Sequence, residues 1–414
     1  MKRYLPLVSL WLLLFLTGCY DLTELEQKAY VVAIGIDRTD EQGMYEVSFQ
    51  MANPEVGTTT QAAATDEQPK ETVTLVAPDF ISAQNTANSF VTRELTFDHT
   101  KVLIISEELA RSGELLNIIQ SANQESQLRR GVQMIVSKEK ASEFLTNTAP
   151  PMETRPHKYY QFMLERGQET GLIPDADIHR FFQITEGDAD LFLAIYATSM
   201  ITDKGANGSE DEYVAGEVPQ VNRQETQFIG SAVFKEGTMI DRLDGEETRL
   251  TLIMDNTLNM EDVLTTYPDP MDDHYRITTK YIQKDKTSVK INYVQDGQAK
   301  IDIYIPFHLE VLAVPSLIDY SNNKENLQLL RTSLETYITD VAEKLIKKTQ
   351  EEYKSEPFYW SLYVRHHFKT ISEYEAADWH NQIYPNADIT ITFDLKNIRF
   401  GKLIKSADLD EVRD

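Results

Sequence analysis

Hydrophobic runs separated by turn-forming residues organise the first half of the chain. Residues 30–37 are almost continuously apolar and predict a buried strand, while residues 45–51 alternate polar and apolar positions and predict its hairpin partner. The same criteria predict strands at 72–76, 101–106, 132–136 and 191–196. Apolar residues at helical spacing predict helices at 78–91, 107–120, 138–145, 156–167 and 174–182. Because helices and strands alternate, we assign residues 19–202 to one or more mixed α/β domains.

Three stretches lack this periodicity. Residues 53–71 are rich in Thr, Ala and Gln, which predicts a surface loop. Residues 203–227 are rich in Gly and acidic residues, which predicts an interdomain linker or a long loop. Residues 401–414 are strongly charged and predict a C-terminal tail.

The pattern resumes over residues 228–400. A strand is predicted at 228–234, a helix at 246–254, and an antiparallel meander at 275–283, 288–294 and 299–311. A long amphipathic helix follows, capped around Asn322–Asn323 and carrying apolar positions from Leu327 to Leu345, before a last strand at 387–395. We therefore expect a C-terminal α/β domain with antiparallel strands and a long helix. The expected fold class is α+β or mixed α/β, in a multi-domain ectodomain with mixed sheets and packed helices.

The first residues have the pattern of a cleaved leader. Lys2 and Arg3 precede an apolar run from Leu5 to Leu16, which is shorter than the roughly 20 residues that a membrane-spanning helix needs. The run ends at Leu16-Thr17-Gly18-Cys19, which resembles the lipobox of bacterial prolipoproteins. We therefore expect residues 1–18 to be a lipoprotein signal peptide and Cys19 to carry the lipid, as an S-diacylglycerol and N-palmitoyl cysteine. The alternative is an ordinary signal peptide followed by a chance cysteine.

Composition and net charge exclude several kinds of partner. The chain of 414 residues has one cysteine, so it can form no internal disulfide, and that cysteine occupies the lipidation position. The formal net charge of −26 argues against a nucleic-acid partner and against polybasic docking on anionic lipid. Attachment to the membrane is therefore expected to depend on the lipid anchor, with the ectodomain on the outer face.

Several segments, in order along the chain, resemble the Ger(x)C family of spore germination lipoproteins. They are Leu16–Asp21, Val32–Asp37, Phe97–Ile105, Gly230–Lys235, Leu243–Arg249 and Ile383–Ala387. Tyr20 departs from the family pattern, which has Trp at this position. The resemblance implies a C subunit of a nutrient germinant receptor, anchored by lipid at the spore inner membrane or cell membrane. Its implied partners are the integral-membrane A and B subunits, and the family supplies no catalytic residues.

The sequence contains no Gly-rich phosphate loop, nucleophile elbow or metalloprotease motif, so we predict neither an enzyme nor a bound cofactor or metal. Adjacent His366 and His367 would point about 100° apart on a helix, which disfavours chelation of one ion. The other candidates considered are the acid pairs Glu246–Glu247 and Asp272–Asp273 and the neighbours Asp98–His99. Surface, capping or structural hydrogen-bonding roles are the more frequent ones for such groups.

Three function classes remain after these exclusions. The first is a noncatalytic receptor subunit that is needed for spore germination. The second is a lipid-anchored solute-binding protein of a membrane transporter, which exported α/β domains also permit. The third is a surface hydrolase, for which no candidate residues occur. The sequence leaves open whether the chain binds a small-molecule ligand.

Overall fold

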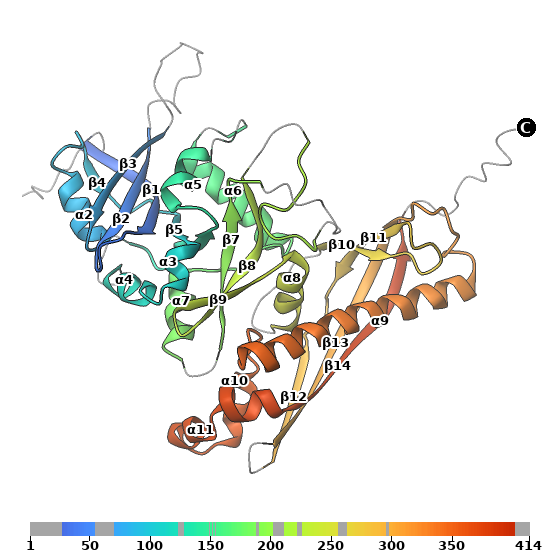
Figure 1. Ribbon diagram of the computed structural model, residues 1–414. Coiled ribbons are helices and arrows are strands. Elements are labelled where there is room, and N and C mark those ends of the chain that lie inside the picture. Colours follow the sequence, from blue (N-terminus) through green and yellow to red (C-terminus); the bar gives the residue numbers. More distant parts are fainter. Residues whose placement is uncertain are drawn as a thin grey trace, which may run out of the picture.

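The computed structural model describes residues 27–53, 70–122, 128–148, 150, 152–153, 155–187, 190–201, 211–221, 226–255, 263–294 and 298–401. Over these residues the chain forms two bodies, each built on one β-sheet (Figure 1). We call the nine-stranded sheet with its helices the N-terminal body. The five-stranded sheet with its helices is the C-terminal body.

The N-terminal sheet has the strand order β3-β2-β1-β5-β6-β7-β8-β9, and β4 pairs with β1. Its inner strands β1, β5, β6 and β7 run parallel, while β2 and β3 at one side and β8 and β9 at the other pair antiparallel. The strands are β1 Lys28–Arg38, β2 Tyr45–Ala52, β3 Lys70–Ala77, β4 Glu94–Thr96, β5 Val102–Ser106, β6 Gln133–Ser137, β7 Phe192–Thr198, β8 Gln227–Lys235 and β9 Thr238–Leu243.

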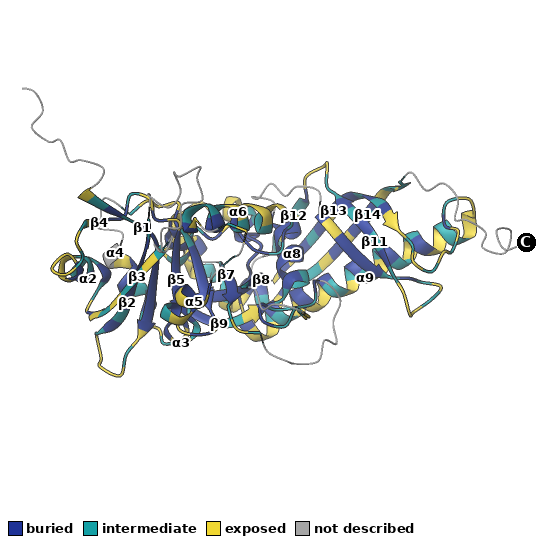
Figure 2. Cartoon of the chain, turned by 90° about the horizontal axis from the view of Figure 1, so that it is seen from above, coloured by how far each residue is buried: buried dark blue, intermediate teal, exposed yellow. Residues whose placement is uncertain are grey.

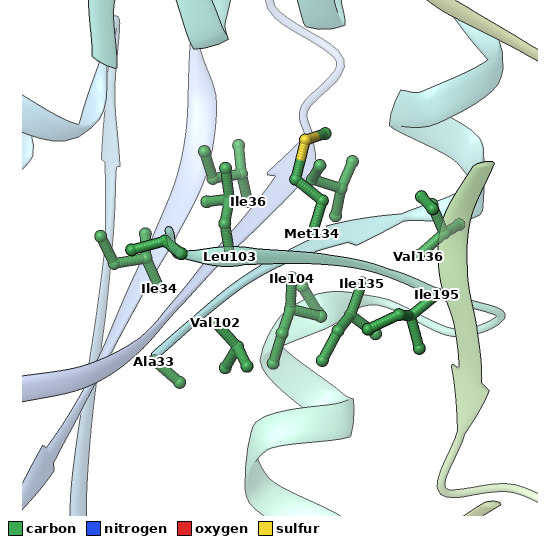
Figure 3. Close-up of a cluster of buried hydrophobic side chains, with 14 of the residues drawn as sticks. Ala33, Ile34, Ile36, Val102, Leu103, Ile104, Met134, Ile135, Val136 and Ile195 are labelled. Atoms are coloured by element: carbon green, nitrogen blue, oxygen red, sulfur yellow. The ribbon is translucent and has the colours of Figure 1, made fainter. Parts of the chain in front are cut away.

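The inner strands of this sheet are buried on both faces, which explains their continuous apolar runs. In Figure 3, Ile104 and Ile135 point to one side of the sheet, and Leu103 and Met134 point to the other. All four side chains are at most 2% exposed. The sequence predicted these strands from their continuous apolar runs, which are rich in β-branched residues. Both faces of the strands are buried, so no polar residues interrupt the runs.

Helices cover this sheet and follow the predicted order. They are α2 Phe80–Ala87, α3 Glu107–Arg111, α4 Leu115–Ala122, α5 Ala141–Asn147, α6 Pro156–Glu169 and α7 Ile178–Thr185. The single helix predicted at 107–120 is wrong, because Gly113 adopts a left-handed backbone with φ of 80° and separates α3 from α4. The helix predicted to reach residue 91 ends at Ala87, so Phe90 lies outside its buried stripe and is 58% exposed.

The C-terminal sheet contains β10 Val263–Pro268, β11 Arg276–Ile282, β12 Ser288–Val294, β13 Gln298–Ala313 and β14 Asp388–Phe400. Its order is β10-β11-β13-β12, with β14 parallel to β13. The predicted meander is right in pairing β12 with β13 but wrong in pairing β11 with β12, because β11 pairs with β13. β12 pairs with the first half of β13 and β11 with the second half, so the long strand β13 has both as neighbours on one edge.

One long helix covers the C-terminal sheet. α9 Lys324–Lys348 runs along β13 and β14 and places its buried stripe against them, while its opposite side is exposed (Figures 1 and 2). The predicted cap is confirmed, because the Asn323 side chain accepts hydrogen bonds from the backbone N–H groups of Glu325 and Asn326. The remaining short helices are η3 Thr349–Tyr353, α10 Ser361–Val364, η4 Arg365–His367, α11 Ile371–Ala377, η5 Trp379–Ile383 and η6 Tyr384–Asn386.

The predicted linker at 203–227 does not separate the N-terminal sheet from the C-terminal sheet. β8 and β9 follow it in the chain and yet complete the N-terminal sheet, so the change of sheet comes after α8 Gly245–Met254. Part of the predicted linker packs closely, since Ala215 N donates to Ile229 O and Gly245 N donates to Tyr213 O. Residues 1–26, most of the predicted loop at 53–71, and 402–414 lie outside the described residues.

Candidate functional site

The two bodies meet where the segment after α9 lies against the N-terminal sheet. Asp190, two residues before β7, forms an isolated parallel bridge with Glu356 of that segment. Leu191 N donates to Glu356 O at 3.1 Å, and Lys235 Nζ donates to Tyr353 O at 2.9 Å. These contacts join residues more than 100 positions apart in the chain, so nothing in the local sequence pattern predicted them.

Two carboxyl groups are buried together at this junction. The Glu356 carboxylate accepts hydrogen bonds from the backbone N–H groups of Phe358 at 2.6 Å and Ser361 at 3.0 Å. Burial, and then the neighbouring Asp190, raise the pKa of Glu356 well above its usual value. Burial also raises the pKa of Asp190 to about 6. The pair therefore resists full ionisation, because each charge would face the other with little water to screen it.

A second polar contact crosses the junction beside this pair. Arg180 of α7 forms an ion pair with Asp255 at 2.9 Å, and the Asp255 side chain is only 1% exposed. The guanidinium group of Arg180 also lies over the ring of Tyr359, 4.6 Å from its centroid. Trp360 is fully buried next to these groups and donates from Nε1 to Met254 O at 3.4 Å. The junction thus combines a charge contact with the packing of large aromatic side chains.

A cavity of about 490 Å³ opens at the same junction. One wall comes from the end of α7, Asp190 and the β8–β9 turn, and the other comes from α11 and the start of η5. Carboxyl groups are its most frequent charged groups. They belong to Asp190, Glu236, Glu375 and Asp378.

The sequence-predicted acid and histidine candidates do not form one site. Cys19 lies outside the described residues. Glu247 completes a capping box with Asp244 at the start of α8, and Glu246 accepts a hydrogen bond from Tyr337. These two acids therefore have the capping and structural roles that such pairs commonly have.

The remaining candidates are spread over the surface and the N-terminal sheet. Asp272 and Asp273 lie on the turn between β10 and β11 with the exposed His274, and their ligand atoms are close enough to hold an ion. His366 and His367 pack ring to ring at 4.0 Å, and His367 Nε2 contacts Ile291 O. The neighbours Asp98 and His99 have separate structural contacts, since Asp98 accepts from Thr96 and His99 packs edge-on against Tyr30.

Three of the segments that carried the family resemblance make contacts between elements. Gly230 in β8 has a left-handed φ of 87°, and a Cβ at this position would overlap the carbonyl oxygen of Leu243. Ser231 of the Gly230–Lys235 segment and Thr248 of the Leu243–Arg249 segment are joined by a 2.9 Å hydrogen bond. Near the C-terminus, Tyr384 bonds through its hydroxyl to Thr349 at 2.6 Å. These three segments therefore fix contacts between elements.

Asp37 in the first family segment is also structural. Its buried carboxylate accepts hydrogen bonds from the N–H groups of Ala141 and Ser142, at the start of α5, although burial raises the pKa of Asp37. A carboxylate at a helix N-terminus is stabilised by the N–H groups that have no partner within the helix. The side chain thus joins β1 to the helix that covers it.

Comparison with known proteins now gives the family. Residues 21–198 match the model described as spore germination protein N-terminal domain, and residues 229–401 match that of spore germination B3/GerAC like, C-terminal. The chain belongs to the GerAC-like family of spore germination proteins. The family resemblance predicted from the sequence is confirmed. Neither description names a catalytic activity.

Individual relatives agree with this membership. The chain is 21% identical to spore germination protein B3 of Bacillus subtilis (strain 168) over 96% of the chain and 98% of that protein. It is 27% identical to spore germination protein KC of the same organism, over 37% of the chain and 38% of that protein. The crystal structure of the GerBC protein matches 92% of the chain with a TM-score of 0.50 and 16% identity. This structural match supports the predicted fold class of mixed sheets and helices.

Proposed function

We propose that this GerAC-like protein is the lipid-anchored, noncatalytic C subunit of a nutrient germinant receptor. In this proposal it acts through protein contacts with integral-membrane A and B subunits, on the outer face of the spore inner membrane or cell membrane. The observation that carries the proposal is the order of features in the chain. A lipobox-like segment ends at Cys19, and the spore germination match begins at residue 21 and continues in a second match to residue 401.

The position of β1 supports a short tether. β1 begins at Lys28, nine residues after Cys19. Nine residues span at most about 30 Å even when fully extended, so a lipid on Cys19 would keep the N-terminal body close to the bilayer. Among the described helices, none has both the length and the hydrophobicity required to cross a bilayer. We propose the lipid on Cys19 as the attachment.

The structural roles of the family segments support a subunit without chemistry of its own. Gly230, Ser231 and Thr248 fix contacts between elements, and Asp37 binds a helix N-terminus. In a noncatalytic subunit, residues of this kind are expected to be retained because they maintain the shape that the partners bind. We assign no cofactor to the chain.

Replacing the lipidated residue tests the anchor and the function together. In the full-length chain, Cys19→Ala is expected to release the protein from the membrane fraction and to abolish the spore's response to its nutrient, while spore formation stays normal. Gly18→Ala is the matched control, because it keeps a small residue before the cysteine and is expected to preserve both properties. Immunoblotting of both variants checks that protein is still made. A normal germination response from Cys19→Ala would refute the proposal.

The proposed partners can be tested separately. Purification of the tagged full-length chain from detergent-solubilised membranes is expected to recover integral-membrane A and B subunits, identified by mass spectrometry. The same purification from cells with the Cys19→Ala variant is the control, since an unanchored chain should recover less of them. Recovery of a transporter without germination subunits would favour the solute-binding alternative.

A further inference from the structure

The cavity at the junction has an excess of acidic groups. Asp190 from the N-terminal body and Asp378 from the C-terminal body lie in opposite walls, and the exposed acids Glu236 and Glu375 stand with them. The basic groups in the lining are Lys235 and His380, and both have protein partners. Lys235 donates to Tyr353 O, and His380 Nδ1 lies 2.7 Å from Ser355 Oγ. A bound cation would therefore find carboxylates that the lining does not neutralise.

One buried donor in the wall of the same cavity has no partner. Trp379 lines the cavity and is 2% exposed, and among the described residues its Nε1 is a buried donor without a hydrogen-bond partner. The side chains of Asp190 and Tyr374, in the same wall, both interact with Ser361. Since more than nine in ten buried polar groups in proteins are paired, the indole N–H group of Trp379 indicates a missing partner.

The chemistry of these atoms restricts the ligand. The Trp379 Nε1–H group can only donate, so its partner must carry an acceptor such as a hydroxyl or carbonyl oxygen. The exposed carboxylates of Glu236 and Glu375 can only accept, so their partner must carry a donor. The ligand that satisfies both, and that complements the acidic lining, has an ammonium group and an oxygen acceptor.

The backbone of the cavity wall is unusual in the same place. Asp378 has a positive φ of 49°, and it caps η5, which is a π-helix that begins with Trp379. Glu236, in the opposite wall, has a φ of 50°. Such conformations cost energy for residues other than glycine, and π-helical turns are frequent at functional sites. The backbone therefore holds Trp379 and Glu236 at the cavity at some cost in stability.

We propose that this cavity binds a small polar organic cation, with its ammonium group among the carboxylates and its oxygen accepting a hydrogen bond from Trp379. The volume of about 490 Å³ lies within the range of small-molecule sites. The proposal goes beyond the function proposed above and does not depend on the lipid anchor. Because both bodies contribute to the walls, a ligand in this position would also strengthen the contact between them.

Three probes of nearly equal size test the charge requirement. Ethanolamine, ethylene glycol and glycolate share a hydroxyl group and differ in carrying an ammonium, a hydroxyl or a carboxylate at the other end. Calorimetric titration of the full-length chain in detergent, at about pH 7.5, is expected to show binding of ethanolamine at least about tenfold tighter than that of either other probe. No heat from ethanolamine would mean that the cavity holds only water and would overturn the proposal. Equal or tighter binding of glycolate would overturn it as well.

Variants locate the binding site. Glu236→Gln and Glu375→Gln change exposed side chains in opposite walls and are each expected to weaken ethanolamine binding about two- to fivefold without loss of folding. The matched control is Asp272→Asn with Asp273→Asn, which removes two carboxylates on the distant β10–β11 turn and is expected to leave the affinity unchanged. Trp379→Phe removes the indole donor and tests whether the oxygen of the ligand accepts a hydrogen bond from Trp379. An equal loss from the distant pair and the cavity variants would identify nonspecific attraction to an acidic protein and reject the site.

Discussion

The two sheets differ in how their faces are covered. Every residue of β5 and β7 is buried, whereas β13 alternates buried positions with exposed or partly exposed ones over most of its length. Several helices cover the N-terminal sheet, but the C-terminal sheet depends on α9 for its main cover (Figure 1). The difference indicates that the N-terminal body is held by many small contributions and that the C-terminal body is more vulnerable to changes in one helix.

The C-terminal body nevertheless does not stand alone. Its hydrophobic core includes Leu191, which directly precedes β7, and Leu193, Val233 and Leu243 of the strands β7, β8 and β9 toward one edge of the N-terminal sheet. The strands β7, β8 and β9 therefore serve two cores, one on each face. Damage to this edge is expected to affect both bodies, while damage to α9 is expected to affect one.

The largest effect on stability is expected at Gly230, which belongs to one of the family segments and lies in β8 at this edge. Gly230→Ala would place a Cβ against the Leu243 carbonyl at a positive φ of 87°. The strained backbone and the steric overlap together should lower the free energy of unfolding by about 4 kcal/mol. Urea denaturation, followed separately in the two bodies by hydrogen exchange, should show that both lose protection.

Gly43→Ala provides the matched control for this prediction. Gly43 also has a positive φ, of 78°, but a Cβ there meets no atom within 4 Å. The backbone strain alone should cost about 1 kcal/mol. An equal loss at the two positions would show that the close approach to Leu243 contributes nothing.

The next effect should be confined to the C-terminal body. Ile338→Ala removes a side chain of α9 that is 4% exposed, which should cost about 3 kcal/mol because a cavity remains in the core. Hydrogen exchange should speed up in β13 and β14 and stay unchanged in β5 and β6. Leu329→Ala, on the exposed side of the same helix at 46% exposure, is the control and should cost less than about 0.5 kcal/mol. Faster exchange throughout both bodies would contradict the proposed difference between them.

The same contrast explains how much the sequence could predict. The inner strands of the N-terminal sheet and the stripe of α9 were predicted because burial leaves a periodic signal in neighbouring residues. The pairing of β13 with β11 and β14 was missed, because register between strands that are not consecutive in the chain has no local signature. β10 was missed because Val263–Pro268 is short and has two central threonines.

The junction was missed for a related reason. Asp190 and Glu356 lie 166 positions apart, and an acid beside an apolar run is common at ordinary strand ends. Asp190 and Glu356 come together, and are buried, when the chain folds. Cys19 was the candidate with a strong local motif, and it stays a prediction because it lies outside the described residues.

The buried acids predict a third, smaller effect that depends on pH. The pKa of Asp190 is raised to about 6 by burial, and Glu356, Asp255 and Arg365 are the charged groups that affect it most. A raised pKa means that the stabilising contribution is complete below the unfolded-state pKa near 3.8 and is lost as pH rises through about 6. The contribution of Asp190 to the free energy of unfolding should therefore fall by about 1 to 2 kcal/mol between about pH 5 and pH 8.

One variant distinguishes the effect of the Asp190–Glu356 pair on stability from the effects of other buried acids. The pKa values of Asp244 and Glu246 are also raised, to about 7, chiefly by burial, so they contribute a loss of the same sign. Glu356→Gln removes the neighbouring charge and should reduce the fall in stability without abolishing it. Stability that rises over this range in the unmodified chain would contradict the buried-pair account.

The smallest predicted effect concerns the cap of α9. Asn323 accepts hydrogen bonds from two backbone N–H groups that have no partner within the helix, so Asn323→Ala should cost about 1 kcal/mol. Asn323→Asp keeps the acceptor and adds a negative charge at the helix N-terminus, so its stability should equal or exceed that of the unmodified chain. Urea denaturation measures both, and hydrogen exchange should place the loss in the first turn of α9. If both variants lost the same stability, the cap would contribute nothing, and the vulnerability of the C-terminal body would lie in the buried stripe of α9 alone.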